Sequence, residues 1–137
     1  LIWHASNFWQ TKLRLILNNY SLSLNEYLIL ETLNKYLEFS FQSKISSFSG
    51  IDESVVSVCL KSLEKKGLIK RTVDYDNRKK VITILPDGQK LFDEIFPQIN
   101  QQENNIFDKL QDEKLNFCNL LKLILGKKIR IKAGKFL

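Results

Sequence analysis

The feature that most constrains this chain is a change in its hydrophobic pattern at Gly67. Before it, apolar residues recur about every three or four positions, the period of an amphipathic helix. Directly after it, residues 68–73 and 80–85 are two short runs rich in β-branched side chains, which is typical of strands. Asp and Asn in the connection over 74–78 favour a turn. The sequence therefore predicts a mainly α fold with one small antiparallel β-hairpin.

Helices are expected on both sides of this hairpin, because apolar residues recur there at helical spacing. The short third helix is expected to bury Ile45 and Phe48. Pro86 is tolerated in the first turn of the fifth helix, and Pro97 is expected to kink it. The predicted helices cover residues 3–18, 24–37, 42–48, 52–66, 86–106 and 113–125.

Local signals indicate where several of these helices begin and end. Ser23 lies three residues before Glu26, which is the spacing of a capping box. Asp52 is expected to cap the fourth helix, since Asp is among the preferred N-cap residues. Gly50 and Gly67 are expected to end the third and fourth helices, because glycine adopts the left-handed conformation that stops a helix.

The size and composition are those of one ordinary domain over residues 1–137, with 44% hydrophobic and 26% charged residues. No apolar run reaches the roughly 18 residues of a membrane span, and no signal-peptide pattern opens the chain. We therefore expect a cytoplasmic protein without membrane association. The sequence begins at Leu1 and contains no Met, so we expect it to be part of a longer translated product.

Residue types suited to catalysis or metal binding are scarce in this sequence. His4 is the only histidine, and Cys59 and Cys118 form no C-x-x-C pair. Both cysteines lie among apolar residues, so we expect small packed side chains in a reducing compartment. Because no nucleophile–base pair or ligand cluster can be assembled from these residues, the sequence predicts no enzyme, no metal site and no cofactor.

Positive charge is concentrated in two segments of the chain. Residues 61–80 hold 8 basic and 3 acidic side chains, and residues 127–137 hold 5 basic and no acidic ones. The rest of the chain carries a small negative excess, because the net charge of the whole is only +6. This distribution favours a polyanion-binding surface, and a solvated basic face has the same pattern. For the basic tail over 127–137, a second nucleic-acid contact and an arm that aids solubility are both open.

The order helix, short helix, helix and two-stranded hairpin is that of a winged helix-turn-helix. Such a fold presents one helix to the major groove of DNA, and its hairpin reaches the flanking backbone or minor groove. The fourth helix has an apolar face that must point inward and a polar face that is free to meet DNA. The candidate DNA-binding residues are Ser54, Val55, Ser57, Val58 and Lys61 on this helix and Asn77, Arg78, Lys79 and Lys80 at the hairpin tip.

Five short segments carry a resemblance to a known family. They are LNEYLIL at 24–30, DES at 52–54, LEKKGLI at 63–69, DNR at 76–78 and DG at 87–88. Their order and spacing, over roughly residues 22–92, resemble those of the MarR family of multiple-antibiotic-resistance regulators. The resemblance implies a homodimeric transcriptional regulator that binds a pseudo-palindromic operator in double-stranded DNA.

The resemblance also implies roles for particular parts of the chain. Residues from about 22 to 90 would bind DNA, and the helices at about 1–20 and 90–126 would form the dimer interface. Those helices are also too apolar to face solvent, which independently favours burial against another subunit. Arg78 would enter the minor groove, and Asp76 would hold it in place. Since many members release DNA on binding a small, often phenolic ligand or on oxidation, a small-molecule effector is implied.

The chain departs from the family pattern at Val58, where an Arg or Lys is common. Val58 either touches a thymine methyl group or reflects a weaker readout of the bases. This residue and the serine-rich face keep one alternative open, a winged-helix protein–protein interaction module without specific DNA binding. Oxidant-sensing members carry a Cys in or near the first helix, and neither Cys59 nor Cys118 lies there.

Overall fold

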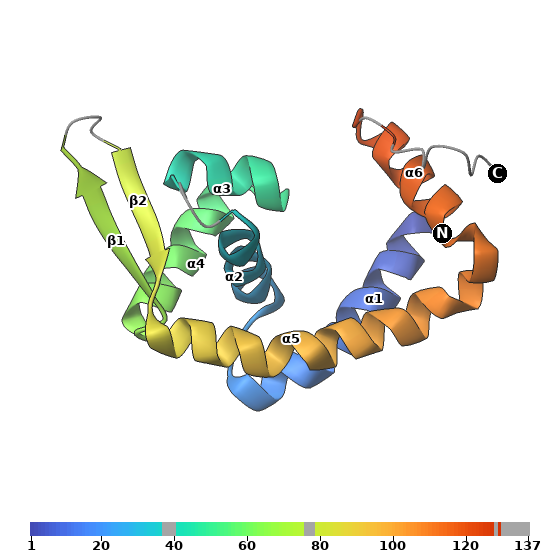
Figure 1. Cartoon of the computed structure of the whole chain (residues 1–137), viewed down its shortest axis with the longest axis horizontal. Coiled ribbons are helices and arrows are strands. Elements are labelled where there is room, and N and C mark those ends of the chain that lie inside the picture. Colours follow the sequence, from blue (N-terminus) through green and yellow to red (C-terminus); the bar gives the residue numbers. More distant parts are fainter. Residues whose placement is uncertain (37–40, 76–78, 128, 130–137) are drawn as a thin grey trace. The chain divides into compact units, whose positions relative to one another are not determined.

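The computed structural model describes residues 1–36, 41–75, 79–127 and 129 (Figure 1). By its internal contacts the chain divides into two compact units, Leu1–Asn100 and Gln101–Leu137. The first unit holds α1 (Ile2–Leu17), the 3₁₀ turn η1 (Asn18–Tyr20), α2 (Leu24–Lys35), α3 (Gln42–Ser49), α4 (Glu53–Lys65), β1 (Ile69–Asp74) and β2 (Lys79–Ile84). The long helix α5 (Pro86–Phe107) begins in the first unit, and η2 (Asp108–Glu113) and α6 (Lys114–Ile124) lie in the second. Each predicted helix is therefore confirmed, with ends shifted by one or two residues.

The predicted hairpin is confirmed as a two-stranded antiparallel sheet beside α3 and α4 (Figure 1). Its register pairs Ile69 with Ile84 at one end and Asp74 with Lys79 at the other. An isolated antiparallel bridge also joins Phe41 to Val81, so the start of α3 lies along the free edge of β2. The connection predicted at 76–78 is outside the described residues.

The core of the first unit is one apolar cluster to which the helices α1 to α5 and both strands contribute. It forms because each helix turns one apolar face inward, as the helical period predicts. Phe48 is an exception, since it is 46% exposed and stacks on Tyr36 with ring centroids 4.3 Å apart. The prediction that Phe48 is buried is therefore wrong, because its side of α3 has no further element to pack against within the described residues. The most deeply buried members are Leu13, Leu17, Tyr27, Ile29, Leu30, Ile45, Leu60, Leu63, Ile69, Ile95 and Ile99.

Most predicted helix ends are confirmed in atomic detail. The Ser23 hydroxyl accepts a bond from the Glu26 amide at 3.1 Å, and the Glu26 carboxylate accepts one from the Ser23 amide at 3.1 Å. Gly50 and Gly67 end α3 and α4 with φ values of +75° and +74°. Asp52 occupies the N-cap of α4, but the prediction that its side chain caps the helix is wrong. Its carboxylate accepts instead from the Ser54 hydroxyl at 3.2 Å, two residues on.

A close backbone approach seats the hairpin against α5. The Leu85 amide donates to the Leu68 carbonyl at 3.0 Å, which joins the end of β2 to the residue before β1. Gly88 lies in the first turn of α5, and a Cβ atom there would lie 2.1 Å from the same carbonyl oxygen. Only glycine leaves room for this approach. Helix α5 then runs through Pro97 as a single element, so the chain is helical on both sides of the position where a kink is expected.

The second unit contains α6, an apolar helix whose side chains the other described residues leave exposed. No residue of α6 is buried, and Ile124 is 72% exposed. Cys118 is also exposed, so the prediction that it is packed is wrong, whereas Cys59 in α4 is buried as predicted. Among the described residues, no helix is both long enough and apolar enough to cross a membrane.

Candidate nucleic-acid interface

Helix α4 turns a polar face to solvent and an apolar face to the core. Val56, Leu60 and Leu63 are at most 2% exposed, which places the side of α4 that they share inside the protein. The opposite side carries the predicted site residues Ser54, Val58 and Lys61, which are exposed, and Ser57, which is half-buried. The sequence-based assignment of these two faces is therefore confirmed for these positions.

Val55 departs from the prediction that it projects outward with the other site residues. Its side chain is half-buried and packs against the core cluster. Positions four residues apart lie about 40° apart around a helix, so Val55 lies at the edge of the inner face, next to buried Cys59. Of the predicted site residues on α4, Ser54, Ser57, Val58 and Lys61 therefore remain on the outward face.

The hairpin, whose strand β1 contacts α4, also carries exposed basic side chains. Lys79 and Lys80 at the start of β2 are both exposed, as is Lys70 on β1. The Lys79 ammonium group lies 4.9 Å from the ring centroid of Phe41, at the bridge between the α3 segment and β2. This contact limits the directions that Lys79 can take, because the cation is attracted to the ring face. Asp76, Asn77 and Arg78 lie outside the described residues, so their predicted roles stay predictions.

Arg71 joins the base of the hairpin to α4. Its guanidinium group donates to the Glu64 carboxylate, with Nη2 2.9 Å and Nε 3.3 Å from Oε1. The hydrogen bonds from Arg71 lower the pKa of Glu64, so that carboxylate is ionised at neutral pH. Arg71 is therefore paired within the protein, and this ion pair connects strand β1 of the hairpin to α4.

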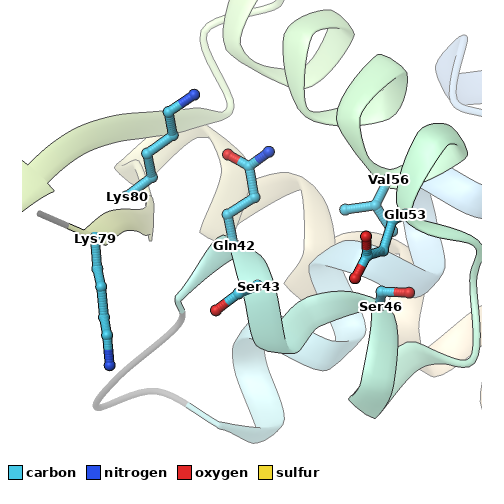
Figure 2. Close-up of a pocket in the computed structure, with 7 residues that line it drawn as sticks. All are labelled: Gln42, Ser43, Ser46, Glu53, Val56, Lys79 and Lys80. Atoms are coloured by element: carbon cyan, nitrogen blue, oxygen red, sulfur yellow. The ribbon is translucent and has the colours of Figure 1, made fainter.

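A groove of about 420 Å³ runs between α3, α4 and β2 (Figure 2). Figure 2 shows Lys79 and Lys80 at one end of the groove and Ser46, Glu53 and Val56 at the other. Sequence reasoning missed the contribution of α3, because that helix meets the hairpin through long-range contacts such as the bridge between Phe41 and Val81. The lining residues are Gln42, Ser43, Ser46, Glu53, Val56, Lys79 and Lys80.

An ion pair between buried Glu26 and exposed Lys66 fixes the C-terminal end of α4 to the start of α2. The Lys66 ammonium lies 3.0 Å and 3.2 Å from the two oxygens of Glu26 and 2.8 Å from the Ser21 carbonyl oxygen. The Ser62 hydroxyl donates to the same carboxylate at 3.1 Å. Burial alone would raise the pKa of Glu26, but the bonds from Lys66 and Ser23 outweigh it and hold that pKa below its ordinary value. The carboxylate therefore stays charged, and it holds the exposed face of α4 at a defined angle.

Cys59 takes no part in this polar network. Burial raises the pKa of its thiol, and the negative charge of Glu26 raises it further. A thiol in such surroundings stays protonated and inert at neutral pH. Within the described residues no group of three or more His, Cys, Asp or Glu side chains is placed to hold a metal ion.

Known proteins with similar sequences include helix-turn-helix regulators. The MarR family profile matches residues 22–81. The Bacillus subtilis (strain 168) HTH-type transcriptional regulator YdcH is 32% identical over 97 residues, and the alignment covers 66% of this chain and 65% of YdcH. This chain therefore spans slightly less than two thirds of the length of that relative.

Solved structures show the same fold. Bordetella bronchiseptica BpsR, whose DNA binding is regulated by 6-hydroxynicotinic acid, superposes with a TM-score of 0.84 at 20% identity, covering 93% of this chain and 92% of BpsR. S. aureus MepR in complex with DNA superposes with a TM-score of 0.81 at 23% identity, covering 92% and 93%. Residues 22–81 thus match the profile of the MarR family, and these superpositions show the same winged helix-turn-helix fold.

Proposed function

We propose that this protein is a transcriptional regulator that binds double-stranded DNA sequence-specifically, as a homodimer on a pseudo-palindromic operator. The observation that carries the proposal is the exposed face of α4, with Ser54, Val58 and Lys61, next to a hairpin with exposed Lys79 and Lys80. A helix face of this size fits the major groove, and cations beside it meet the phosphates that flank the groove. The complex of MepR with DNA supports the same use of the fold.

The chemistry of these side chains determines which of them contribute affinity and which contribute sequence preference. Lysines supply affinity by neutralising phosphates, and side chains that reach base edges supply sequence preference. The outward side chains Ser54, Ser57 and Lys61 offer hydroxyls and an ammonium group, and hydroxyls bond to several bases, so base readout is limited. Arg78, held by Asp76, is proposed to reach into the minor groove from the hairpin tip.

The homodimer is proposed on the apolar surface that α1 and α6 each leave uncovered. Trp3 of α1 is 71% exposed, and Ile124 and Leu125 at the end of α6 are 72% and 67% exposed. Large apolar patches on a folded chain mark a surface that another chain covers. Two copies related by a two-fold axis would present two α4 helices to half-sites about one helical turn apart.

A small-molecule effector is also proposed, because 6-hydroxynicotinic acid regulates the DNA binding of BpsR, which has the same fold. A regulator acts where the DNA is, so we propose the cytoplasm as its location, and regulation instead of catalysis as its role.

The test is a binding selection with the full chain. Random duplexes are incubated with the protein at low and at moderate salt, and the retained fraction is sequenced. We expect an enriched inverted repeat and an affinity that falls log-linearly with salt. No binding at low salt would overturn the proposal and favour a protein-interaction module.

A matched pair of variants sharpens this experiment. Lys80→Gln should reduce the slope of log affinity against log salt by about 1 for each subunit, because one phosphate contact is lost. Lys90→Gln removes an exposed lysine from α5 and should leave the slope unchanged. Equal slopes for both variants would exclude the hairpin from the interface.

A further inference from the structure

Val58 is an apolar side chain on the outward face of α4. It is 67% exposed, whereas Val56, Cys59 and Leu60 beside it in sequence are at most 9% exposed. Its side chain lies opposite the face that α4 packs into the core, so it contributes nothing to that packing. Leaving a valine in water forgoes the stabilisation that burial provides. The fold of the single chain therefore offers no reason for an apolar residue here.

The neighbours of Val58 indicate what kind of surface it meets. Ser54 lies one turn before it on the same side of α4, and Lys61 lies one turn after it, both exposed. The exposed Lys79 and Lys80 belong to the adjacent hairpin. Lysines around a neutral centre suit a polyanion that also presents an apolar group at the middle of the contact.

DNA presents one such group in the major groove, the C5-methyl group of thymine. The helix Glu53–Lys65, which is described throughout, contains no Arg, Asn or Gln. On its outward face Lys61 can bond to guanine, and Ser54 and Ser57 can bond to more than one base, but hydrogen bonds from these side chains do not detect a methyl group. Val58 is therefore the side chain of this face that is suited to the thymine methyl group.

We propose that Val58 is a specificity-determining residue that contacts the methyl group of a thymine in each operator half-site. The inference rests on the proposed DNA-binding function and deepens it, since it names a chemical group that the operator must contain. It follows that the half-site has a thymine, or another 5-methylpyrimidine, at the base pair facing the middle of α4.

The experiment uses the duplex enriched in the selection described above. Each thymine of the inverted repeat is replaced in turn by deoxyuridine, which removes the methyl group and leaves base pairing intact. For one thymine in each half-site we expect wild-type affinity to fall about fourfold, which is the change in affinity expected when one methyl group is no longer buried. The Val58→Ala variant should bind the original duplex more weakly and should lose this sensitivity to deoxyuridine.

The control is Val73→Ala, which shortens a valine of β1 that is 49% exposed. This variant should keep the full deoxyuridine effect, whatever its own affinity. Cytosine and 5-methylcytosine at the sensitive position form a second arm, in which the methyl group should recover part of the affinity for wild type only.

Two results would overturn the inference and leave the DNA-binding function intact. One is an operator in which no deoxyuridine replacement weakens wild-type binding. The other is an undiminished deoxyuridine effect in Val58→Ala. Failure to bind any duplex at low salt is a different result, because it removes the DNA-binding function and the inference with it.

Discussion

At the scale of single residues, the most consequential side chain inside the protein is Glu26. It caps α2 through Ser23 and pairs with Lys66 at the end of α4, so one carboxylate holds two helices. Its own surface is 6% exposed, and a buried charge of this kind is stabilising only when its partners are in place. The orientation of the proposed DNA-binding face therefore depends on an ion pair far from that face.

We predict that Glu26→Gln destabilises the protein by about 1–3 kcal/mol at neutral pH, because Lys66 and the Ser62 hydroxyl lose a charged acceptor. The folded-state pKa of Glu26 is lowered, so its contribution is fully present above the ordinary value of about 4.3. That contribution is lost as the pH falls through the lower folded-state pKa. Urea denaturation at pH 7 and pH 3 should show a difference between variant and wild type that shrinks in acid.

The control for this measurement is Glu64→Gln, which breaks the more exposed pair with Arg71. Exposed ion pairs contribute little, so its effect at pH 7 should be the smaller of the two. A Glu26→Gln variant as stable as wild type at pH 7 would contradict the role assigned to the carboxylate.

At the scale of elements, the hairpin is positioned by its two ends. Arg71 binds Glu64 of α4 on one side, and Leu85 and Gly88 meet the Leu68 carbonyl on the other. The α4 helix itself ends in a Schellman arrangement at Gly67, in which the Leu68 amide donates to the Leu63 carbonyl at 3.0 Å. The hairpin and α4 are thus joined within a few residues of each other.

We predict that Gly88→Ala destabilises the first unit by about 1–3 kcal/mol, the usual cost of inserting a methyl group where none fits. The new Cβ would meet a backbone carbonyl at 2.1 Å, so the start of β1 or of α5 must shift. Thermal unfolding of the variant measures the loss. Lys90→Ala, at an exposed site of the same helix, should stay within about 0.5 kcal/mol of wild type.

At the scale of the whole molecule, α1 and α6 each carry exposed apolar side chains. Side chains such as Trp3, Leu123 and Ile124 are more than half exposed. A second copy that covers them would also double the number of DNA-facing helices. Assembly and DNA affinity are therefore expected to depend on the same residues.

We predict that the double variant Leu121→Lys and Ile124→Lys is a monomer, because two charges replace apolar contacts in the proposed interface. Its affinity for the two-half-site operator should fall on the order of 100-fold, since the second half-site no longer binds as part of one molecule. Analytical ultracentrifugation and anisotropy titration measure the two effects. Val73→Lys, which charges an exposed valine of β1, should stay dimeric.

Much of the architecture was predictable from the sequence, because its causes are local. The helical period of residues 53–65 assigned the inner and outer faces of α4, and Gly50 and Gly67 marked two helix ends. The capping box at Ser23 and the β-branched runs of the hairpin were predictable for the same reason. Each of these signals acts over a few neighbouring residues, so no knowledge of the remaining chain is needed to interpret it.

The tertiary structure decided what depends on residues far apart in the chain. Glu26 meets Lys66 across 40 positions, and Gly88 meets the Leu68 carbonyl across 20. No period or local propensity encodes such pairings, because they arise only when helices and hairpin pack together. For the same reason the exposure of Phe48 and Cys118 was predicted wrongly, since burial depends on whether another element arrives to cover a side chain.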